Sequence, residues 1–276
     1  MQGAILQLNV TDDPAANLPV TVGMLRQAVA DGAEFVLTPE VTNCISTSRK
    51  HQKDVLQLED DDITLAALRA EAKAAGIWLL IGSLGLKTGD ADGRFANRSF
   101  LIGPDGGIVA KYDKIHMFDV QINETETWRE SEGYRPGTQA VLAETDFASV
   151  GMTVCYDVRF SHLYRALAKA GAQIFTVPAA FSPVTGAAHW HALLRARAIE
   201  SGCFVIAPAQ TGTHASATNK TRDTYGHSLV IDPWGEVLLD AGTAHGVYKF
   251  DLNMEKVNEA RGRVPSLDNA RDFSGP

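Results

Sequence analysis

The sequence of 276 residues has few cysteines and no long apolar run. Its three cysteines, Cys44, Cys155 and Cys203, are far apart and odd in number, which predicts a reducing compartment and no disulfide framework. A CxxC pair is also missing, so a structural zinc site is not expected. Nothing approaches the roughly 20 apolar residues that span a bilayer, and the start MQGAILQLNV does not resemble a signal peptide. We therefore expect a cytoplasmic protein without a membrane partner.

Positive charge is also scarce. The chain carries 25 Lys and Arg against 33 Asp and Glu, a formal net charge of −8, whereas nucleic-acid binding usually requires a basic face. No nucleic-acid partner is expected, and an anionic small molecule would have to be met by a few local cations. The composition is otherwise ordinary for a globular protein, with 45% hydrophobic and 21% charged residues. Without any linker or low-complexity tract, the sequence predicts one domain over residues 1–276.

Short apolar runs alternate with segments of helical apolar spacing. Strands are expected at residues 4–10, 34–39, 77–82, 99–102, 108–111, 149–155, 173–178, 204–208, 228–231 and 237–239. Helices are expected at residues 15–30, 62–75, 161–170 and 187–201, each followed within two positions by a glycine, which is a common helix stop. The sequences GPDGG and DPWGE predict hairpin turns.

The two halves of the chain resemble each other. LRAEAKAAGIWLLIG at 68–82 matches LRARAIESGCFVIAP at 194–208, and SFLIGPDGGIV at 99–109 matches SLVIDPWGEVL at 228–238. FVLTPE at 35–40 resembles FTVPAA at 175–180 in its strand-ending proline. Three matches in the same order predict an internal duplication. Two similar α/β halves that pack their sheets face to face would form a four-layer α-β-β-α sandwich, with the ends of the strands at 34–39 and 149–155 facing a shared cleft.

Cys155 ends an apolar strand in VGMTVCYD. A turn at a strand end can expose a nucleophile, and its neighbouring backbone N–H can help to hold an oxyanion. The alternative is a buried cysteine that packs as a small hydrophobe, which is our interpretation of Cys203. Cys44 lies in a loop near Glu40, and we favour a structural role for it.

Glu40 follows TP at a strand end, where burial can raise the pKa of a carboxyl group and make it a general base. It could equally be a solvated loop residue. Lys114, in KYDKIHMFD, could hold an oxyanion or lie on the surface. A Cys–His hydrolase would instead need a histidine such as His116 or His189, and spacing alone leaves both mechanisms open. His189 and His191 point in different directions on a helix, so they are not expected to chelate a metal.

The segments TPEVTN, YDKIHMFD and GMTVCYDVRF resemble the three catalytic segments of the nitrilase superfamily. The resemblance continues through RESEGYRPG, AFSPVTGAAHW and YGHSLVIDPWGEV and covers nearly the whole chain. It implies the same α-β-β-α fold and a mechanism without metal or organic cofactor. In that mechanism Cys155 attacks an amide carbon, Glu40 exchanges protons, and Lys114 and the Tyr156 backbone N–H hold the oxyanion.

The resemblance implies further site residues. Glu130, in RESEGYRPG, corresponds to a second glutamate that would orient the lysine. CYDVRF followed by AFSPVTGAAHW resembles the branch of omega-amidases and deaminated-glutathione amidases. In that branch Arg159 would bind the substrate carboxylate, and Phe181 and Thr185 would line the same pocket. LLRARAIE and AQTGTH favour the deaminated-glutathione amidases over the omega-amidases.

Several alternatives stay open at this stage. The superfamily also contains carbamoylases, other aliphatic amidases and true nitrilases, and a silent binding module could use the same fold. Residues 46–62 and 210–223 match no particular member and would border the cleft, so the substrate could be deaminated glutathione, α-ketoglutaramate or another amide. Because the family often dimerises through one face, a homodimer or larger homo-oligomer is expected.

Overall fold

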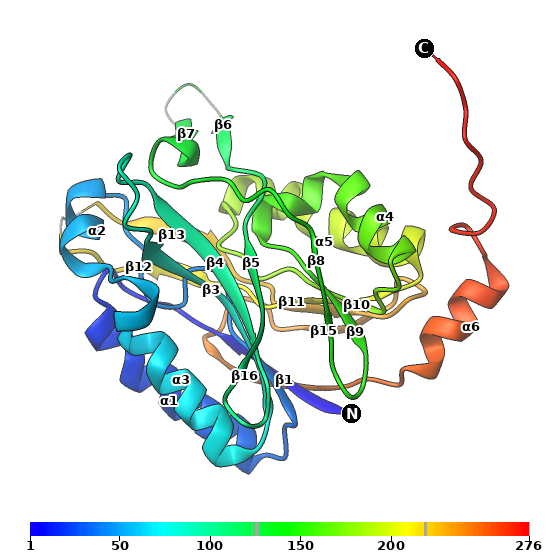
Figure 1. Cartoon of the computed structure of the whole chain (residues 1–276), viewed down its shortest axis with the longest axis horizontal. Coiled ribbons are helices and arrows are strands. Elements are labelled where there is room, and N and C mark those ends of the chain that lie inside the picture. Colours follow the sequence, from blue (N-terminus) through cyan, green and yellow to red (C-terminus); the bar gives the residue numbers. More distant parts are fainter. Residues whose placement is uncertain (123, 125–126, 218–219, 276) are drawn as a thin grey trace.

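A computed structural model describes residues 1–122, 124, 127–217 and 220–275 (Figure 1). Most of its strands form two six-stranded sheets. The first sheet has the order β16 (Gly246–Asp251), β1 (Gln2–Gln7), β2 (Phe35–Leu37), β3 (Trp78–Lys87), β4 (Phe95–Ile102) and β5 (Ile108–Asp113). The second has the order β15 (Val237–Asp240), β14 (Leu229–Ile231), β11 (Phe204–Ala207), β10 (Ile174–Thr176), β9 (Ser149–Met152) and β8 (Val141–Glu144).

The two sheets share one topology. In the first, β1, β2 and β3 are parallel, and β16 and β4 flank them antiparallel. In the second, β9, β10 and β11 are parallel, and β8 and β14 flank them antiparallel. The strand pairs that resemble each other in sequence occupy equivalent places, because β2, β3, β4 and β5 correspond to β10, β11, β14 and β15. The predicted architecture of two similar halves is therefore confirmed.

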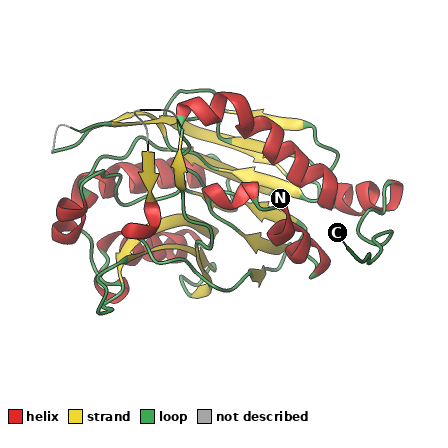
Figure 2. Ribbon diagram, turned by 90° about the horizontal axis from the view of Figure 1, so that it is seen from above, coloured by secondary structure: helices red, strands yellow, loops and turns green. Residues whose placement is uncertain are grey.

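Helices cover the outer faces of the sheets (Figures 1 and 2). On the first sheet lie α1 (Pro14–Ala30) and α3 (Ile63–Ala75), and on the second lie α4 (Ser161–Lys169) and α5 (Pro183–Ser201). Alternate residues of a strand point to opposite faces. In β1, Ile5 packs into the core between the sheets, whereas Ala4 and Leu6 pack against the outer helices.

The helix ends follow local rules. The Asp62 side chain accepts the Leu65 N–H at the start of α3, and Gly76 ends the helix with φ +65°. Only glycine adopts that left-handed conformation at little cost. Between these ends, Leu65, Leu68 and Ala72 are buried at the spacing of one helix face.

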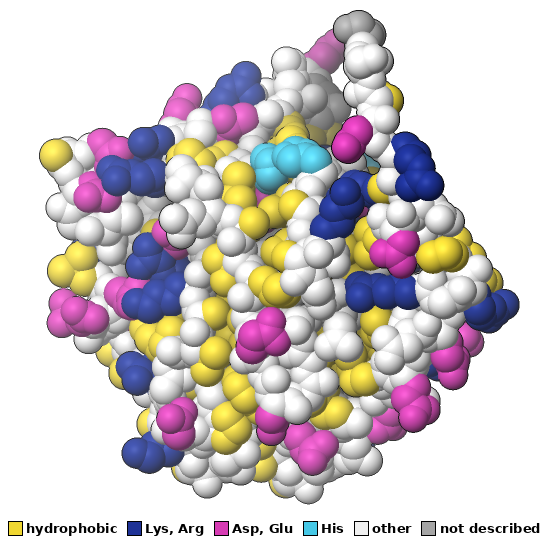
Figure 3. All heavy atoms as spheres, turned by 45° about the vertical axis from the view of Figure 1, so that its right-hand side comes forward, with side chains coloured by type: hydrophobic (Ala, Val, Ile, Leu, Met, Phe, Trp, Pro, Cys, Tyr) yellow, Lys and Arg dark blue, Asp and Glu magenta, His cyan; other side chains and the backbone are white. Residues whose placement is uncertain are grey.

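Further elements lie outside the two sheets and their covering helices. They are helices α2 (Arg49–Val55) and α6 (Glu255–Arg263), and the hairpins β6 (Asp119–Gln121) with β7 (Thr127–Arg129) and β12 (Thr211–His214) with β13 (Arg222–Tyr225). Short 3-10 helices span Glu59–Asp61, Glu130–Glu132 and Cys155–Arg159. On the face shown in Figure 3, acidic and basic side chains are interspersed with apolar ones. None of the described helices is long and apolar enough to cross a membrane.

One predicted boundary was wrong in a way that concerns the site. The strand expected over 149–155 ends at Met152, and the chain turns at Cys155 into a 3-10 helix. The apolar run continues past the strand because Val154 and Val158 are buried in the core around the turn. Cys155 is therefore held in a tight turn just beyond the strand.

Candidate active site

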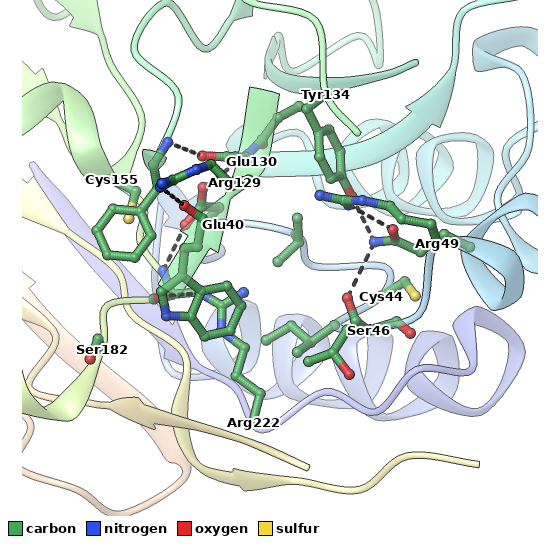
Figure 4. A pocket seen from close by; sticks show the side chains of 18 of the residues that line it. Glu40, Cys44, Ser46, Arg49, Arg129, Glu130, Tyr134, Cys155, Ser182 and Arg222 are labelled. Atoms are coloured by element: carbon green, nitrogen blue, oxygen red, sulfur yellow. Dashed lines mark hydrogen bonds between the residues drawn. The ribbon is translucent and has the colours of Figure 1, made fainter. Parts of the chain in front are cut away.

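A cavity of about 760 Å³ opens at the ends of the parallel strands (Figure 4). Its lining comes from the loops after β2, β5, β9 and β10, from α2, and from both hairpins. Glu40, Lys114, Glu130, Cys155 and Phe181 all line it. The structure thus brings together five of the predicted site residues, although they are spread over more than half of the sequence.

Cys155 sits in a strained turn. Its φ is +50°, a conformation that non-glycine residues adopt only at a cost. The Cys155 N–H donates to the Pro178 carbonyl at 2.8 Å, which ties the turn to the segment after β10. The thiol lies close enough to the Glu40 carboxylate for each group to shift the pKa of the other. The strained backbone conformation fixes the direction of the Cys155 side chain, which lines the cavity.

Glu40 is held from three sides. Its Oε1 accepts from Lys114 Nζ and from Asn97 Nδ2, each at 2.9 Å, and its Oε2 accepts from the Ala180 N–H at 2.9 Å. Its own backbone carbonyl accepts from Gln210 Nε2 at 3.1 Å. A carboxylate with this many donors has a fixed orientation beside the thiol.

Lys114 is only 2% exposed and lies between two carboxylates. Its Nζ donates to Glu130 at 2.9 and 3.0 Å and to Glu40 at 2.9 Å. Asn97 Nδ2 also reaches Glu130, at 3.3 Å. Glu130 Oε2 further accepts the Phe118 N–H at 2.6 Å. A buried ammonium needs such partners, and Glu130 supplies most of them.

The protonation states follow from burial and charge. Burial would raise the pKa of Glu40, but the Lys114 charge and its hydrogen bond outweigh burial, and the pKa lies below its usual range. The expectation that burial raises this pKa is thus wrong in its net effect. Burial, and then the Glu40 charge, raise the pKa of Cys155 well above its usual value. Burial opposes charge on Lys114, yet Glu130 and Glu40 raise its pKa well above normal. The site therefore holds a thiol, a carboxylate and an ammonium.

Asp157 is a buried residue of the site that the sequence did not single out. It is fully buried beneath the Cys155 turn, and its Oδ2 accepts from the Val154 N–H at 2.9 Å and the Tyr112 hydroxyl at 2.7 Å. Its Oδ1 accepts the His116 N–H at 3.0 Å. Tyr112 and His116 flank Lys114 in the sequence, so one carboxylate joins the lysine segment to the cysteine turn. The available signal was an acidic residue inside the apolar run TVCYDV.

The histidines do not support a Cys–His pair. Among the described residues, no histidine lines the cavity. The His116 ring contacts Asp157 at 2.7 Å and stacks on Phe160, and His189 lies 3.3 Å from Arg159. The carboxylate of Glu40, rather than an imidazole, adjoins the thiol.

The remaining predicted site residues lie beside the cavity. Arg159, Tyr156 and Thr185 are not among its lining residues. The Arg159 guanidinium lies 5.5 Å from the centre of the Phe181 ring and 5.7 Å from that of Tyr156. The Thr185 hydroxyl is buried without a partner among the described residues. Carboxylate binding by Arg159 stays a prediction, because its guanidinium reaches the cavity through neighbouring rings, those of Phe181 and of Tyr156 with Phe118.

Both loop segments of unknown role contribute to the cavity. Residues 46–62 contain α2 and supply Ser46, Arg49 and Gln52, and residues 210–223 contain β12 and supply Arg222. Residues 218–219 of the second segment lie outside the described residues.

Among the described residues, one group of side chains could accept a metal, and it lies outside the cavity. His191 Nε2 and His227 Nδ1 contact the Asp240 carboxylate at 3.0 and 2.9 Å, and the three ligand atoms lie within 4.8 Å of one another. His189 contacts Arg159 instead, so the two histidines of HWH have different partners. None of the three residues lines the cavity.

The chain is similar in sequence to amidases over nearly its whole length. It is 36% identical over 272 residues to a deaminated glutathione amidase of Yersinia enterocolitica, covering 98% of this chain and 93% of the relative. It is 34% identical over 268 residues to an omega-amidase of Bos taurus, covering 97% and 94%.

Solved structures agree with the observed fold. The C. elegans NitFhit protein superposes with a TM-score of 0.90 at 34% identity, over 98% of this chain and 65% of that chain. A glutamate-to-glutamine mutant of the amidase from Nesterenkonia sp. superposes with a TM-score of 0.77 at 25% identity, over 96% and 98%. In that mutant, acrylamide has added to the active-site cysteine.

A comparison with protein-family models gives the same result as the fold, the site and these relatives. The model of the carbon-nitrogen hydrolase family matches residues 3–262. The chain therefore belongs to the carbon-nitrogen hydrolase family, the nitrilase superfamily that its sequence resembles.

Proposed function

We propose that the protein is an amidase that hydrolyses the C–N bond of a small carboxylate-bearing amide through a thioester on Cys155. The observation that carries the proposal is the contact between the Cys155 thiol and Glu40, which in turn contacts Lys114. A thiol, a carboxylate and an ammonium in one buried cluster are the parts that acyl transfer needs.

The first half of the proposed reaction forms the thioester. Glu40 takes the Cys155 proton as the sulfur attacks the amide carbon. The carbonyl oxygen becomes an oxyanion, which Lys114 and the Tyr156 backbone N–H stabilise. The C–N bond then breaks, and Glu40 returns the proton to the leaving nitrogen.

The second half regenerates the thiol. Glu40 removes a proton from water, which attacks the thioester carbon and releases the acid. The C–S bond breaks, and the Cys155 sulfur recovers its proton from Glu40. Glu130 holds Lys114 in place throughout, because both oxygens of its carboxylate accept hydrogen bonds from the ammonium. The net change is one water consumed and one amide divided into acid and amine.

The proposed substrate is deaminated glutathione, with α-ketoglutaramate as the smaller candidate of the same class. The names of the relatives support this choice. Arg159 is the proposed partner of the acyl carboxylate, with Phe181 and Thr185 beside it, since its guanidinium lies against the Phe181 ring that lines the cavity. A guanidinium matches a planar carboxylate through paired N–H donors.

The test is to incubate the protein with each compound and measure cysteinylglycine and ammonia release, with a panel of simple amides in parallel. We expect turnover of at least one α-keto substrate, and none with Cys155→Ala. Turnover of a panel amide alone would reject the substrate but keep the chemistry. Full activity of Cys155→Ala would reject the mechanism.

A further inference from the structure

The cavity is positively charged although the chain is acidic. Besides Lys114, it is lined by Arg49, Arg129, Lys220 and Arg222, whereas its only described carboxylates belong to Glu40 and Glu130. Both of these carboxylates already contact Lys114. The other four cations form no described ion pair with these carboxylates, although the Arg222 charge reaches Glu40 and lowers its pKa. A chain of net charge −8 has concentrated cations here.

Arg222 and Arg129 gather around one aromatic residue. The Arg222 guanidinium lies 4.9 Å from the centre of the Trp128 ring, and its Nη2 donates to the Ala180 carbonyl at 2.7 Å. Arg129 Nη1 donates to the Trp128 carbonyl at 3.0 Å. No described carboxylate lies within 4 Å of either guanidinium. These contacts orient the two side chains, while the charges of Arg222 and Arg129 act at longer range on Glu40 and Asp119.

Arg49 is placed in a similar way across the cavity. Figure 4 shows Cys155 on one side and Arg49 beside Tyr134 on the other. The Arg49 guanidinium lies 5.1 Å from the centre of the Tyr134 ring, and its Nη1 donates to Gln52 Oε1 at 2.8 Å. Gln52 is buried and donates to the Tyr134 hydroxyl at 3.0 Å. A buried amide and a buried ring therefore support a guanidinium whose charge has no described carboxylate partner.

Guanidinium groups oriented by rings and carbonyls, without a carboxylate in direct contact, are suited to bind planar anions. Arg159 cannot be part of this group, because it lies outside the cavity lining and against Phe181 and His189. The molecule therefore has two separate cationic sets near Cys155, the first being Arg159 alone and the second Arg49, Arg129 and Arg222. An amide with one carboxylate needs only one set, whereas an amide with a carboxylate on each side of the bond to be cleaved can use both.

We propose that Arg49, Arg129 and Arg222 form a second anion site, which binds a carboxylate on the amine half of the substrate. The enzyme then prefers amides of amino acids or short peptides over primary amides that release ammonia. This inference rests on the proposed amidase function and specifies its leaving group.

The experiment compares pairs of amides that share one acyl half. Each pair consists of a primary amide and the amide of a peptide amine, such as α-ketoglutaramate with deaminated glutathione. Similar pairs on other acyl groups, such as succinamate with N-succinylglycine, keep the comparison valid if the proposed acyl group is wrong. Because both members form the same thioester, their ratio of kcat/KM isolates the amine half. A third compound carries a neutral carboxamide in place of the peptide carboxylate.

In the unmodified enzyme, we expect the peptide amide to exceed its neutral carboxamide analogue by about 10-fold or more in kcat/KM, the factor typical of one charge-assisted contact. Arg49→Gln, Arg129→Gln and Arg222→Gln should lower the ratio of peptide amide to primary amide, mainly through KM. For the neutral analogue, the ratio of its kcat/KM to that of the primary amide should not change in these three variants. Arg165→Gln, which removes an exposed arginine on α4 outside the cavity, is the matched control and should leave the ratio unchanged.

The outcomes separate the two proposals. Equal losses on both members of a pair would mean that these arginines serve the acyl half or Glu40, and would overturn the second site. An unchanged ratio in all three variants would overturn it as well, while Cys155-dependent turnover would leave the amidase proposal standing. If no pair is turned over at all, the proposed function and the second site both fail.

Discussion

The two halves of this protein have the same backbone plan and different chemistry. The Thr38 N–H donates to the Leu80 carbonyl at 3.0 Å, and the equivalent Val177 N–H donates to the Ile206 carbonyl at 2.9 Å. Each half then reaches a proline, Pro39 or Pro178. After the proline the first half supplies Glu40, whereas the second supplies Ala179 and Ala180.

The charged side chains of the proposed catalytic cluster come from before residue 140, and the thiol comes from the second half. Glu40, Lys114 and Glu130 form the ion cluster, whereas the second half gives Cys155 and the Ala180 N–H. The two halves share the same arrangement of strands, but they differ in the residues that follow the strand ends. Equivalent positions on a shared scaffold can therefore take complementary roles at one site.

The comparison is tested most severely at Cys155. Replacing Cys155 by Ala should lower the rate of amide hydrolysis on the order of 10⁴-fold or more, because the nucleophile is removed. The free energy of unfolding should change by only about 1 kcal/mol, since the side chain is small. Product release assays and urea unfolding measure the two effects. A large loss of stability with retained activity would assign Cys155 to packing.

Lys114→Met tests the charged half. It leaves the buried carboxylates of Glu40 and Glu130 without their shared cation, so we expect a loss of about 3–5 kcal/mol of unfolding free energy as well as of activity. The double variant with Glu130→Gln should recover part of the stability and none of the activity. Urea unfolding of both variants is the measurement, and equal stability of Lys114→Met and the unmodified protein would contradict the buried ion cluster.

Asp157→Asn tests the link between the halves. It keeps the shape but weakens the contacts that join the Tyr112 and His116 segment to the Cys155 turn. We expect kcat to fall roughly 10- to 100-fold and the unfolding free energy to fall by about 2 kcal/mol. Tyr112→Phe removes a single one of these contacts and should have a smaller effect on both. If Asp157→Asn lost stability without any change in kcat, its role would be structural alone.

His214 tests a second contact between the halves, through pH. Its Nδ1 contacts the Val10 carbonyl at 2.7 Å, and burial, helped by the Arg222 charge, lowers its pKa to about 4. The unfolded chain binds the extra proton below pH 6.5, so stability contributed by neutral His214 is complete above that pH and is lost as the pH falls towards 4. The loss should reach about 3 kcal/mol. Unfolding measured from pH 7 to pH 4 should show a shallower decline in His214→Gln.

Much of the fold could be predicted because apolar runs mark buried strands. The runs at β2, β3, β10 and β11 are buried on both faces and read clearly. β8 and β16 were missed, since they are edge strands whose residues are half exposed and of mixed polarity. The hairpins were missed for the same reason, and α2 is too short for its spacing to be recognised.

The site divides in a similar way. Glu40, Lys114, Glu130 and Cys155 could be selected from short segments with a known resemblance. Asn97 could not, because FANRSFLI does not show which polar residue of the strand is buried. Arg222 begins a hairpin strand, and its approach to Glu40 depends on contacts between segments far apart in the sequence.

The crossing hydrogen bonds at the strand ends have a consequence for how activity arises during folding. Glu40 is anchored by an N–H of the second half, and the Asp157 carboxylate of the second half anchors the lysine segment. Neither sheet alone can align a base with the thiol, because the hydrogen bonds that fix both cross between the sheets. In a refolding time course, far-ultraviolet circular dichroism should therefore recover before catalysis, and turnover should report the final docking of the sheets.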